Sequence, residues 1–583
     1  MTAPNRNTLW GESIVAELVA NGVRAVCIAP GSRSTPLTVA AANHPEMTVF
    51  SHLDERSAAF FALGRGRRTG EATAVVCTSG TAAANFHPAV MEANEGRVPL
   101  LVLTADRPPS LQDSGANQTT DQTNLYGSAV RYGRTLPEPE AEPRKLRSLR
   151  VTVSRAVGET TGTPPGPVHL NVPFRKPLEP TPVEGDVPAE FEKANPLAAT
   201  GRDGPFVTQR RGQSRLPPAQ REALAAAVDS ADRGLIVCGP ALEPTPGRDA
   251  LESLASATGF PVLADPLSGH RFGPHVASVP VCGGYDSYLD GCEWPDPDLV
   301  VRFGASPTSK TLRQYLAGAG TEQILVDPGG GWREAEFTGT ELVSADPTLL
   351  AEELAAKGLS GGRDAYRERF VGMERQYWEI VEAACEEQWF EGAVVNRTAE
   401  LLPDPATVFV SNSMPVRDLD RFGEPATGDV SVLGNRGVSG IDGVVSSGLG
   451  AGSATAEPLV VVLGDLAFYH DMNGLLALER CDVDATVVLI DNDGGGIFHK
   501  LPISEFEPPF TEQFLTPHGL DFAPVAELYG FEFERATSPE EFAELFEASV
   551  RSQGTQLVSV RTDAERSHEQ RERLHERVLA ERA

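Results

Sequence analysis

The sequence predicts an α/β protein made of three doubly wound parallel-sheet domains. Short segments rich in β-branched residues alternate with helical patterns along the chain, and each segment is apolar over its whole length. Strands of this kind are buried on both faces, which is typical of parallel sheets covered by helices. Most of them end in Gly, Ser, Asp or Asn, so functional loops are expected at the carboxyl ends of the strands. The predicted strands lie within residues 25–31, 72–80, 100–108, 234–240, 299–304, 407–413, 459–465 and 485–492.

These strands fall into three blocks. The first block covers residues 1–185. It is followed by a linker at 186–218, because that stretch is rich in Pro, Glu and Gly and shows no periodicity. A central block covers 219–360, and a third block covers 361–583. The third block ends in a charged helical pattern at 565–583, for which we predict no function.

The composition is strongly acidic. The 583 residues include 81 Asp plus Glu against 50 Lys plus Arg, which gives a net charge of −31, and only six of the basic residues are lysines. A chain with this charge repels nucleic acids and anionic membranes, so we exclude both as partners. An acidic, lysine-poor surface suits a protein that must stay soluble in concentrated salt, since salt screens its self-repulsion. We therefore hypothesise a halophilic source; the alternative is an ordinary acidic cytosolic protein.

The cysteine pattern and hydropathy indicate a cytoplasmic protein. The seven cysteines are scattered, never spaced as CxxC, and several sit in apolar segments, which favours reduced, buried thiols over disulfides or a zinc site. No apolar stretch approaches the roughly 18 residues of a membrane span. The first residues lack the basic-then-apolar pattern of a secretion signal.

Two polar residues follow neighbouring predicted strands of the third block. Asp465 ends the segment LVVVLGD and Asn492 ends ATVVLIDN, 27 residues later, which is the length of one strand–helix–strand crossover. Either residue alone would more often be a helix cap. Together, a carboxylate and an amide oxygen at one sheet edge suit Mg²⁺, to which Gly494 could add its carbonyl oxygen. Gly464 and the glycines at 494–496 would let the backbone approach a diphosphate closely.

This pattern resembles the thiamin diphosphate (ThDP) fingerprint of the decarboxylase-type enzymes, written GDG…NN. The chain departs from it at Leu466 and at Asp493, which adds negative charge near the diphosphate. The resemblance implies ThDP with Mg²⁺ or Mn²⁺, and pyrimidine-binding, central and diphosphate-binding domains in that order. It implies metal ligation by Asp465, Asn492 and Gly494. The implied cofactor contacts in the second half of the chain are Ser411, Asn412, Gly440, Ile441, Gly464, Asp465, Leu466, Ala467, Asn492, Gly494, Gly495 and Ile497.

A ThDP enzyme also needs a carboxyl group that promotes the reactive tautomer of the aminopyrimidine. Glu55 follows the predicted strand MTVFSHL and opens a helix among small and apolar residues, where a dry carboxyl would form a strong proton-sharing hydrogen bond. On its own it would more often be a first-turn charge that complements the helix dipole. With the fingerprint present, we predict that Glu55 is catalytic. The loop 78–86 resembles the pyrimidine-contacting loop, which implies Thr81 and Asn85 as contacts.

Arginines recur at predicted strand ends, where Arg33, Arg107, Arg417 and Arg436 follow Gly-, Ser- or Pro-marked turns. One such arginine alone is more often structural. Several at the catalytic edge favour recognition of substrates with more than one carboxylate, because a guanidinium grips a carboxylate with two parallel hydrogen bonds.

Six segments extend the resemblance to one family within the ThDP enzymes. GSRSTPLT, HLDERSAAFFALG, LTADRPP with GANQTTDQ, SNSMPVRDLD, NRGVSGIDG and DNDGGGIF closely resemble the 2-succinyl-5-enolpyruvyl-6-hydroxy-3-cyclohexene-1-carboxylate synthase family of menaquinone biosynthesis. The resemblance implies a transferase that decarboxylates 2-oxoglutarate and adds the succinyl carbanion 1,4 to isochorismate. It also implies a homodimer or homotetramer, in which Glu55 of one subunit meets the diphosphate site of another.

The same resemblance assigns substrate contacts. Ser413 and Arg417 would hold the distal carboxylate derived from 2-oxoglutarate, with Arg436 nearby. Ile441 would wedge between the cofactor rings, and Phe498 would form an apolar wall together with Ile497. The residues implied on the isochorismate side are Arg33, Arg107, Asn117, Gln118 and Lys310.

Two other readings stay open at this point. Another ThDP-dependent 2-oxoacid decarboxylase or carboligase, such as acetolactate synthase, would use pyruvate and usually FAD, but the segment at 234–240 shows no clear dinucleotide fingerprint. A catalytically silent binding protein on the same fold is the second alternative. Loss of Glu55, Asp465 or Asn492 would favour it, and all three are present.

Overall fold

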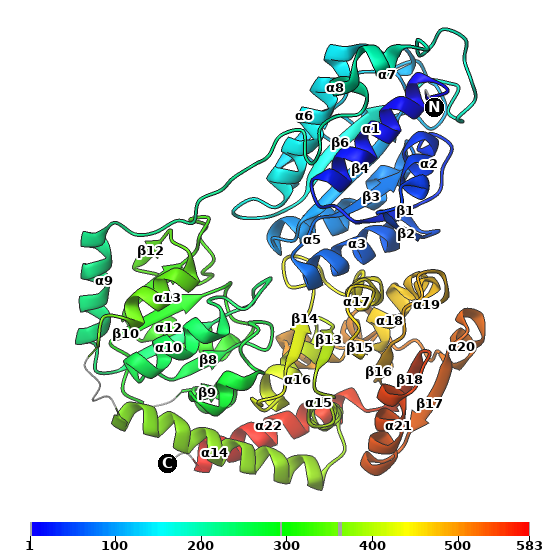
Figure 1. The fold of residues 1–583 in the computed structure, drawn as a ribbon. Helices are drawn as coiled ribbons and strands as arrows, with labels where there is room; N and C mark the ends of the chain where they lie inside the picture. The colour runs from blue at the N-terminus through cyan, green and yellow to red at the C-terminus, as the bar shows by residue number, and fades with distance from the viewer. Residues whose placement is uncertain (1–2, 292–293, 360–363, 582–583) are drawn as a thin grey trace. The chain divides into compact units, whose positions relative to one another are not determined.

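The computed structural model describes residues 3–291, 294–359 and 364–581, and it confirms the predicted α/β architecture with three parallel sheets (Figure 1). Each sheet has six strands, and every strand pair in it is parallel. Its internal contacts group the chain into two compact units. The first unit is Met1–Arg211, Asn435–Thr455 and His470–Val483, and the second is Gly212–Gly434, Ala456–Tyr469 and Asp484–Ala583.

The first sheet belongs to the first unit and has the strand order β2-β1-β3-β4-β6-β5. The order reverses at β1, so the carboxyl ends of β1, β3 and β4 lie next to one another at the position where α/β sheets bind ligands. The strands are β1 Ala25–Ile28, β2 Thr48–Ser51, β3 Thr73–Cys77, β4 Leu100–Asp106, β5 Tyr132–Thr135 and β6 Val168–Pro173. The helices are α1 Arg6–Ala20, α2 Thr35–Asn43, α3 Glu55–Thr69, α4 Thr81–Asn85, α5 His87–Glu95, α6 Pro143–Thr160, α7 Phe191–Ala194 and α8 Pro196–Ala199.

The second sheet belongs to the second unit and has the order β12-β11-β10-β7-β8-β9. Its β-branched strands are buried between helices, as the apolar segments predict. The strands are β7 Gly234–Cys238, β8 Val262–Ala264, β9 Val281–Cys282, β10 Leu299–Phe303, β11 Glu322–Val326 and β12 Glu341–Val343. The helices are α9 Pro218–Ser230, α10 Arg248–Thr258, α11 Tyr285–Tyr288, α12 Lys310–Gly318, α13 Pro347–Ala355 and α14 Asp364–Glu387.

The third sheet has the order β14-β13-β15-β16-β18-β17. In its register Gly464 of β15 lies opposite Ile490 of β16, so the residues that follow these two strands emerge side by side. The strands are β13 Ala406–Val410, β14 Val430–Leu433, β15 Leu459–Gly464, β16 Thr486–Asp491, β17 Glu532–Ala536 and β18 Gln556–Arg561. The helices in this part of the chain are α15 Glu391–Glu400, α16 Met414–Phe422, α17 Val444–Gly452, α18 Asp465–His470, α19 Ala477–Arg480, α20 Ala523–Tyr529, α21 Pro539–Arg551 and α22 Ala564–Glu581, of which α17 and α19 belong to the first unit.

Helices α3 and α17 cross in close contact within the first unit. A Cβ atom on Gly64 of α3 would lie 1.9 Å from the carbonyl oxygen of Ser447, and one on Gly450 of α17 would lie 2.0 Å from that of Phe61. Only glycine allows the two backbones to approach so closely. The contact joins the helix that begins with Glu55 to the helix that follows the loop carrying Ile441.

The described cysteines are free thiols. Four of them are buried and two are half-buried, and burial raises the pKa of the Cys27 and Cys77 thiols well above the ordinary value. Cys292 lies outside the described residues. No helix in the described part of the chain combines the length and apolar character needed to cross a membrane.

Candidate active site

The carboxyl edge of the third sheet brings together the polar residues predicted there. Strands β13, β15 and β16 are direct neighbours, and Ser411 and Asn412 are buried just beyond β13. Asp465 follows β15 as the first residue of α18 and is 2% exposed. Asn492 follows β16 and is half-buried. The parallel register therefore places the side chains of adjacent strand ends at one edge, as the spacing predicts.

The backbone N–H of Gly494 connects the two predicted metal ligands. Its nitrogen lies 2.9 Å from Oδ2 of Asp465 and 3.2 Å from Oδ1 of Asn492, so both oxygens face one small region. Gly494 has a φ of +151°, and a Cβ atom there would lie 2.1 Å from the carbonyl oxygen of Leu515. The turn after β16 therefore requires glycine at this position.

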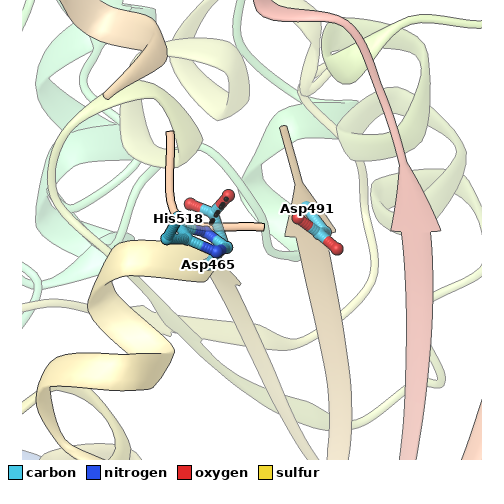
Figure 2. A group of neighbouring side chains, drawn as sticks. All are labelled: Asp465, Asp491 and His518. Carbon is cyan, nitrogen blue, oxygen red and sulfur yellow. Dashed lines mark hydrogen bonds and ion pairs between the residues drawn. The ribbon is translucent and has the colours of Figure 1, made fainter. Parts of the chain in front are cut away.

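His518 and Asp491 join this group, and sequence reasoning missed both (Figure 2). Nε2 of His518 lies 3.3 Å from Oδ2 of Asp465, and Asp465, Asp491 and His518 each offer a ligand atom within 4.8 Å of the others. The strand register could have indicated Asp491, since Gly464 pairs with Ile490. No local pattern points to His518, because it reaches the site from a turn 26 residues beyond Asn492.

Asp493, the acidic departure from the ThDP fingerprint, anchors the turn that carries His518. Its Oδ1 accepts the N–H groups of His518 at 3.1 Å and of Gly519 at 2.7 Å, and Arg561 lies 3.5 Å from its Oδ2. Burial works against the charged form, but these hydrogen bonds and the Arg561 charge outweigh it and hold the pKa of Asp493 below its usual value. The extra charge is thus compensated locally.

The donor set at this edge fits a divalent cation with oxygen preference. Burial raises the pKa of Asp465 to about 6, because the ionised carboxylate loses hydration there and Asp491 lies close by. Nδ2 of Asn492 donates to Glu391 at 2.7 Å, which leaves its Oδ1 toward Gly494 and Asp465. A carboxylate and an amide oxygen that converge in this way suit Mg²⁺ or Mn²⁺.

Glu55 begins α3 in the first unit. Asp54 caps this helix by accepting the N–H groups of Arg56 at 2.8 Å and of Ser57 at 3.3 Å, which fixes where the helix starts. The Glu55 side chain is half-buried, and residues 57–63 behind it are all buried. The carboxyl group thus stands at the boundary between an apolar helix and the solvent-facing surface of the single chain.

Thr81 and Asn85 occupy the two ends of the short helix α4, which follows β3. Both side chains are exposed in the single chain, and Nδ2 of Asn85 donates to the carbonyl oxygen of Thr81 at 3.0 Å. They lie on the surface of the first unit, at the carboxyl side of the first sheet.

Arg33, Arg107 and Gln118 gather at the carboxyl edge of the first sheet. Arg33 donates from Nη1 to the carbonyl oxygen of Phe174 at 2.7 Å, and Arg107 contacts the hydroxyl of Ser79 and the carbonyl oxygen of Gln118. Burial lowers the pKa of the Arg33 guanidinium, the nearby charge of Arg107 lowers it further, and Asp106 partly offsets both. Two neighbouring cations that repel each other are suited to bind an anion.

A cavity of about 690 Å³ opens beside Arg107 and is lined by Asp106, Gln112, Thr119 and Thr135. Asn117 is exposed on the same loop. This loop docks on the end of β3 through the buried Gln122, whose Oε1 accepts the N–H of Gly80 at 2.8 Å.

The loop with Arg436, Gly440 and Ile441 belongs to the first unit and is held by Glu92, which sequence reasoning missed. Glu92 lies on α5, is 0% exposed, and accepts the three successive N–H groups of 437–439 at 2.6–2.9 Å. Its carboxylate also pairs with Arg67 at 2.9 Å. Arg436 and Ile441 are half-buried, and Gly440 is exposed. A buried glutamate with four donors fixes the course of this loop.

The remaining predicted residues lie in the second unit. Ser413 has a φ of +70° before α16, and Nη1 of Arg417 donates to its carbonyl oxygen at 2.5 Å. Lys310 is exposed as the first residue of α12. Phe498 is half-buried with its ring centre 5.3 Å from that of Phe514. Gly464, Leu466 and Ile497 are half-buried, and Ala467 and Gly495 are buried.

Comparisons with known proteins show the family of this chain. Residues 10–125 match the family model of the thiamine pyrophosphate enzyme N-terminal TPP binding domain, and residues 430–560 match that of the C-terminal TPP binding domain. A 2-succinyl-5-enolpyruvyl-6-hydroxy-3-cyclohexene-1-carboxylate synthase of Haloarcula marismortui is 61% identical, over 99% of each chain. The chain belongs to this synthase family. Synthases from Halobacterium salinarum and Roseiflexus sp. are 60% and 48% identical, over 99% and 96% of each chain.

A solved structure shares the fold of this synthase-family chain. The thiamine diphosphate-dependent 4-hydroxybenzoylformate decarboxylase of Rhodococcus jostii RHA1 has a TM-score of 0.69, at 19% identity, covering 95% of this chain and 99% of that chain. At this identity the likeness shows the fold alone. Each matched TPP region contains predicted site residues, Glu55 with Arg33 and Arg107 in one, and Asp465 with Asn492 in the other.

We predict that Asp465→Ala lowers the affinity for ThDP by at least about tenfold, since Asp465 would be a ligand of the divalent cation and its loss would weaken cation binding, and with it the binding of the diphosphate. Excess Mg²⁺ should restore this affinity only partly. Quenching of intrinsic fluorescence on ThDP titration measures the effect. Asp521→Ala, an exposed carboxylate of the same unit, is the control and should leave the affinity unchanged. An unchanged ThDP affinity in Asp465→Ala would contradict the ligand assignment.

Proposed function

We propose that the protein is a ThDP-dependent transferase that decarboxylates 2-oxoglutarate and joins the succinyl unit to isochorismate, forming 2-succinyl-5-enolpyruvyl-6-hydroxy-3-cyclohexene-1-carboxylate for menaquinone biosynthesis. The observation that carries this proposal is the identity of 48–61% to synthases of that name over nearly the whole chain. The convergence of Asp465 and Asn492 around one N–H group supports it from the structure.

The second unit would hold the metal and the diphosphate. Asp465, Asn492 and the carbonyl of Gly494 would bind Mg²⁺ or Mn²⁺, and the backbone at 464–467 and 494–497, with Ser411 and Asn412, would line the cofactor. When bound, ThDP supplies a thiazolium that stabilises the carbanion left by loss of CO₂ from a 2-oxoacid. His518 lies against Asp465 and would be an additional polar neighbour of a cation held there.

Glu55 would hold a proton at the aminopyrimidine N1′ and so favour the tautomer that acts as a base. Its position at the start of α3, beside the buried residues 57–63, supports this role, because a carboxyl that a bound cofactor would shield from water forms a stronger hydrogen bond. Thr81 and Asn85 would contact the same ring, and Ile441 would support its bent conformation. Glu92 would keep the Ile441 loop in place through its three N–H contacts.

Both proposed substrates carry two carboxylates, and the cations of the site match them. Arg33 and Arg107, which repel each other in the free protein, would gain from a bound dianion between them, with Asn117, Gln118 and Lys310 on the isochorismate side. Arg417, which donates to the carbonyl oxygen of Ser413, would hold the distal carboxylate derived from 2-oxoglutarate, with Arg436 nearby and Phe498 as an apolar wall.

We also propose a homodimer or homotetramer in which Glu55 of one subunit completes the diphosphate site of another. The resemblance to ThDP enzymes and the exposure of Thr81 and Asn85 in the single chain support a shared site. The free, mostly buried thiols support a reducing, cytoplasmic location.

With 2-oxoglutarate, isochorismate, ThDP and Mg²⁺, the wild-type protein should release CO₂ and form the succinyl adduct, while pyruvate should give no CO₂. Glu55→Gln should lower kcat by about 10²-fold or more, the usual range for losing a group that holds a catalytic proton. Mass spectrometry identifies the adduct, and a CO₂ assay measures the substrate preference of the wild-type protein and the kcat of Glu55→Gln. Release of CO₂ from pyruvate in preference to 2-oxoglutarate would favour an acetolactate synthase-type enzyme instead, and unchanged turnover in Glu55→Gln would contradict its role.

We propose, in addition, that the acidic surface is an adaptation to high salt. The net charge of −31 and the origin of several relatives in Haloarcula and Halobacterium support it. Screening shortens the reach of surface repulsion from about 10 Å at 0.1 M salt to about 3 Å at 1 M. The Tm in calorimetry should therefore rise steeply between low salt and molar KCl. A Tm and activity that are already maximal without added salt would contradict the proposal.

A further inference from the structure

The charged C-terminal helix α22 buries an arginine beneath the third sheet's edge. Arg571 is 2% exposed, and its Nη2 lies 2.6 Å from Oε2 of Glu391 and 2.5 Å from Oδ2 of Asp418. Its Nε donates to Oδ1 of Asp418 at 2.8 Å. Glu391 and Asp418 are 1% and 0% exposed. A guanidinium that compensates two buried carboxylates is costly to build, so its position calls for a physical explanation.

Glu391 connects this ion cluster to the candidate metal site. It is the first residue of α15, and while Oε2 pairs with Arg571, Oε1 accepts Nδ2 of Asn492 at 2.7 Å. A carboxylate only accepts hydrogen bonds, so the end of the Asn492 amide that faces Glu391 must be the NH₂ group. The opposite end, Oδ1, then points to the N–H of Gly494, 3.2 Å away, on the side of Asp465.

We propose that Arg571 and Glu391 are positioning residues that orient the Asn492 carboxamide for metal binding. This inference rests on the proposed function, because it takes the oxygens of Asp465 and Asn492 as ligands of the cation. Glu391 sets which end of the amide faces the metal, and its negative charge behind the NH₂ group increases the electron density on Oδ1. Partners of this kind behind a ligand commonly set metal affinity. Arg571 fixes Glu391 in place and compensates its charge.

Asp418 provides a matched comparison inside the same cluster. It is as deeply buried as Glu391 and pairs with the same guanidinium, but it lies on α16 and the structure shows no bond from it to Asn492 among the described residues. Glu391→Gln and Asp418→Asn each remove one buried negative charge from Arg571 with little change of shape. Any difference in metal affinity between them therefore reports on the contact to Asn492 rather than on the ion cluster as a whole.

The test is a titration of the protein with Mn²⁺ in the presence of ThDP. Electron paramagnetic resonance measures the concentration of free Mn²⁺ at each step, which gives the Kd. Glu391→Gln should raise the Kd for Mn²⁺ by about 10–100-fold, because glutamine can turn its own NH₂ group toward Asn492 and disfavour the productive orientation. Asp418→Asn should raise the Kd by no more than about a third of that factor. Arg571→Lys, which keeps the charge but cannot grip both carboxylates, should fall between the two.

Circular dichroism checks that each variant is folded. If Glu391→Gln does not fold, the Kd of Arg571→Lys is compared with that of Asp418→Asn instead. Equal effects of Glu391→Gln and Asp418→Asn, or a wild-type Kd in Glu391→Gln or in Arg571→Lys, would overturn the inference. If the cation site of the proposed function is wrong, the result differs, since the wild-type protein itself would then not bind Mn²⁺ together with ThDP; if only the proposed substrates are wrong, the wild-type protein still binds Mn²⁺ and the product assay fails instead.

Discussion

The group of polar side chains at the carboxyl edge of the third sheet depends on one constraint, the passage of the chain through Gly494. Its N–H lies between Oδ2 of Asp465 and Oδ1 of Asn492, and its backbone conformation leaves no room for a side chain against Leu515. The register of β15 and β16 brings the two strand ends together, and the glycine turn then closes around them. His518, anchored by Asp493, and Glu391, held by Arg571, add their side chains to an arrangement that this turn defines.

The sequence predicts the site residues that follow strand ends, and it misses those that reach the site from distant helices and turns. Buried parallel strands present their carboxyl ends at one edge, so Asp465 with Asn492, and Arg33 with Arg107, could be placed near each other from spacing alone. Side chains that arrive from distant helices or turns leave no local pattern. Glu92, His518 and Arg571 read as ordinary polar residues of a helix or loop, because only tertiary packing shows what they face. The three sheets were predictable, since strand burial leaves a strong pattern in every block.

Net charge and local charge have separate roles in this molecule. The chain is strongly acidic, yet in the first unit burial and then the nearby charge of Arg107 lower the pKa of Arg33, so two cations lie close together there. Anionic ligands are therefore compatible with the composition, because two cations meet at a strand edge of the first unit although carboxylates outnumber cations along the chain. In the second unit, several buried carboxylates pair with buried arginines: Asp420 with Arg271, and both Glu391 and Asp418 with Arg571.

In the proposed enzyme, Glu55 of one subunit and the metal site of another act together in catalysis. Subunit complementation tests it most directly: Glu55→Gln and Asp465→Ala proteins are each purified, mixed, dissociated and reassembled, and the rate of adduct formation is measured. A shared site predicts that the mixed dimers regain one intact site of the two, which gives about one quarter of the wild-type rate after random reassembly. A mixture that stays as inactive as its two components would contradict the account.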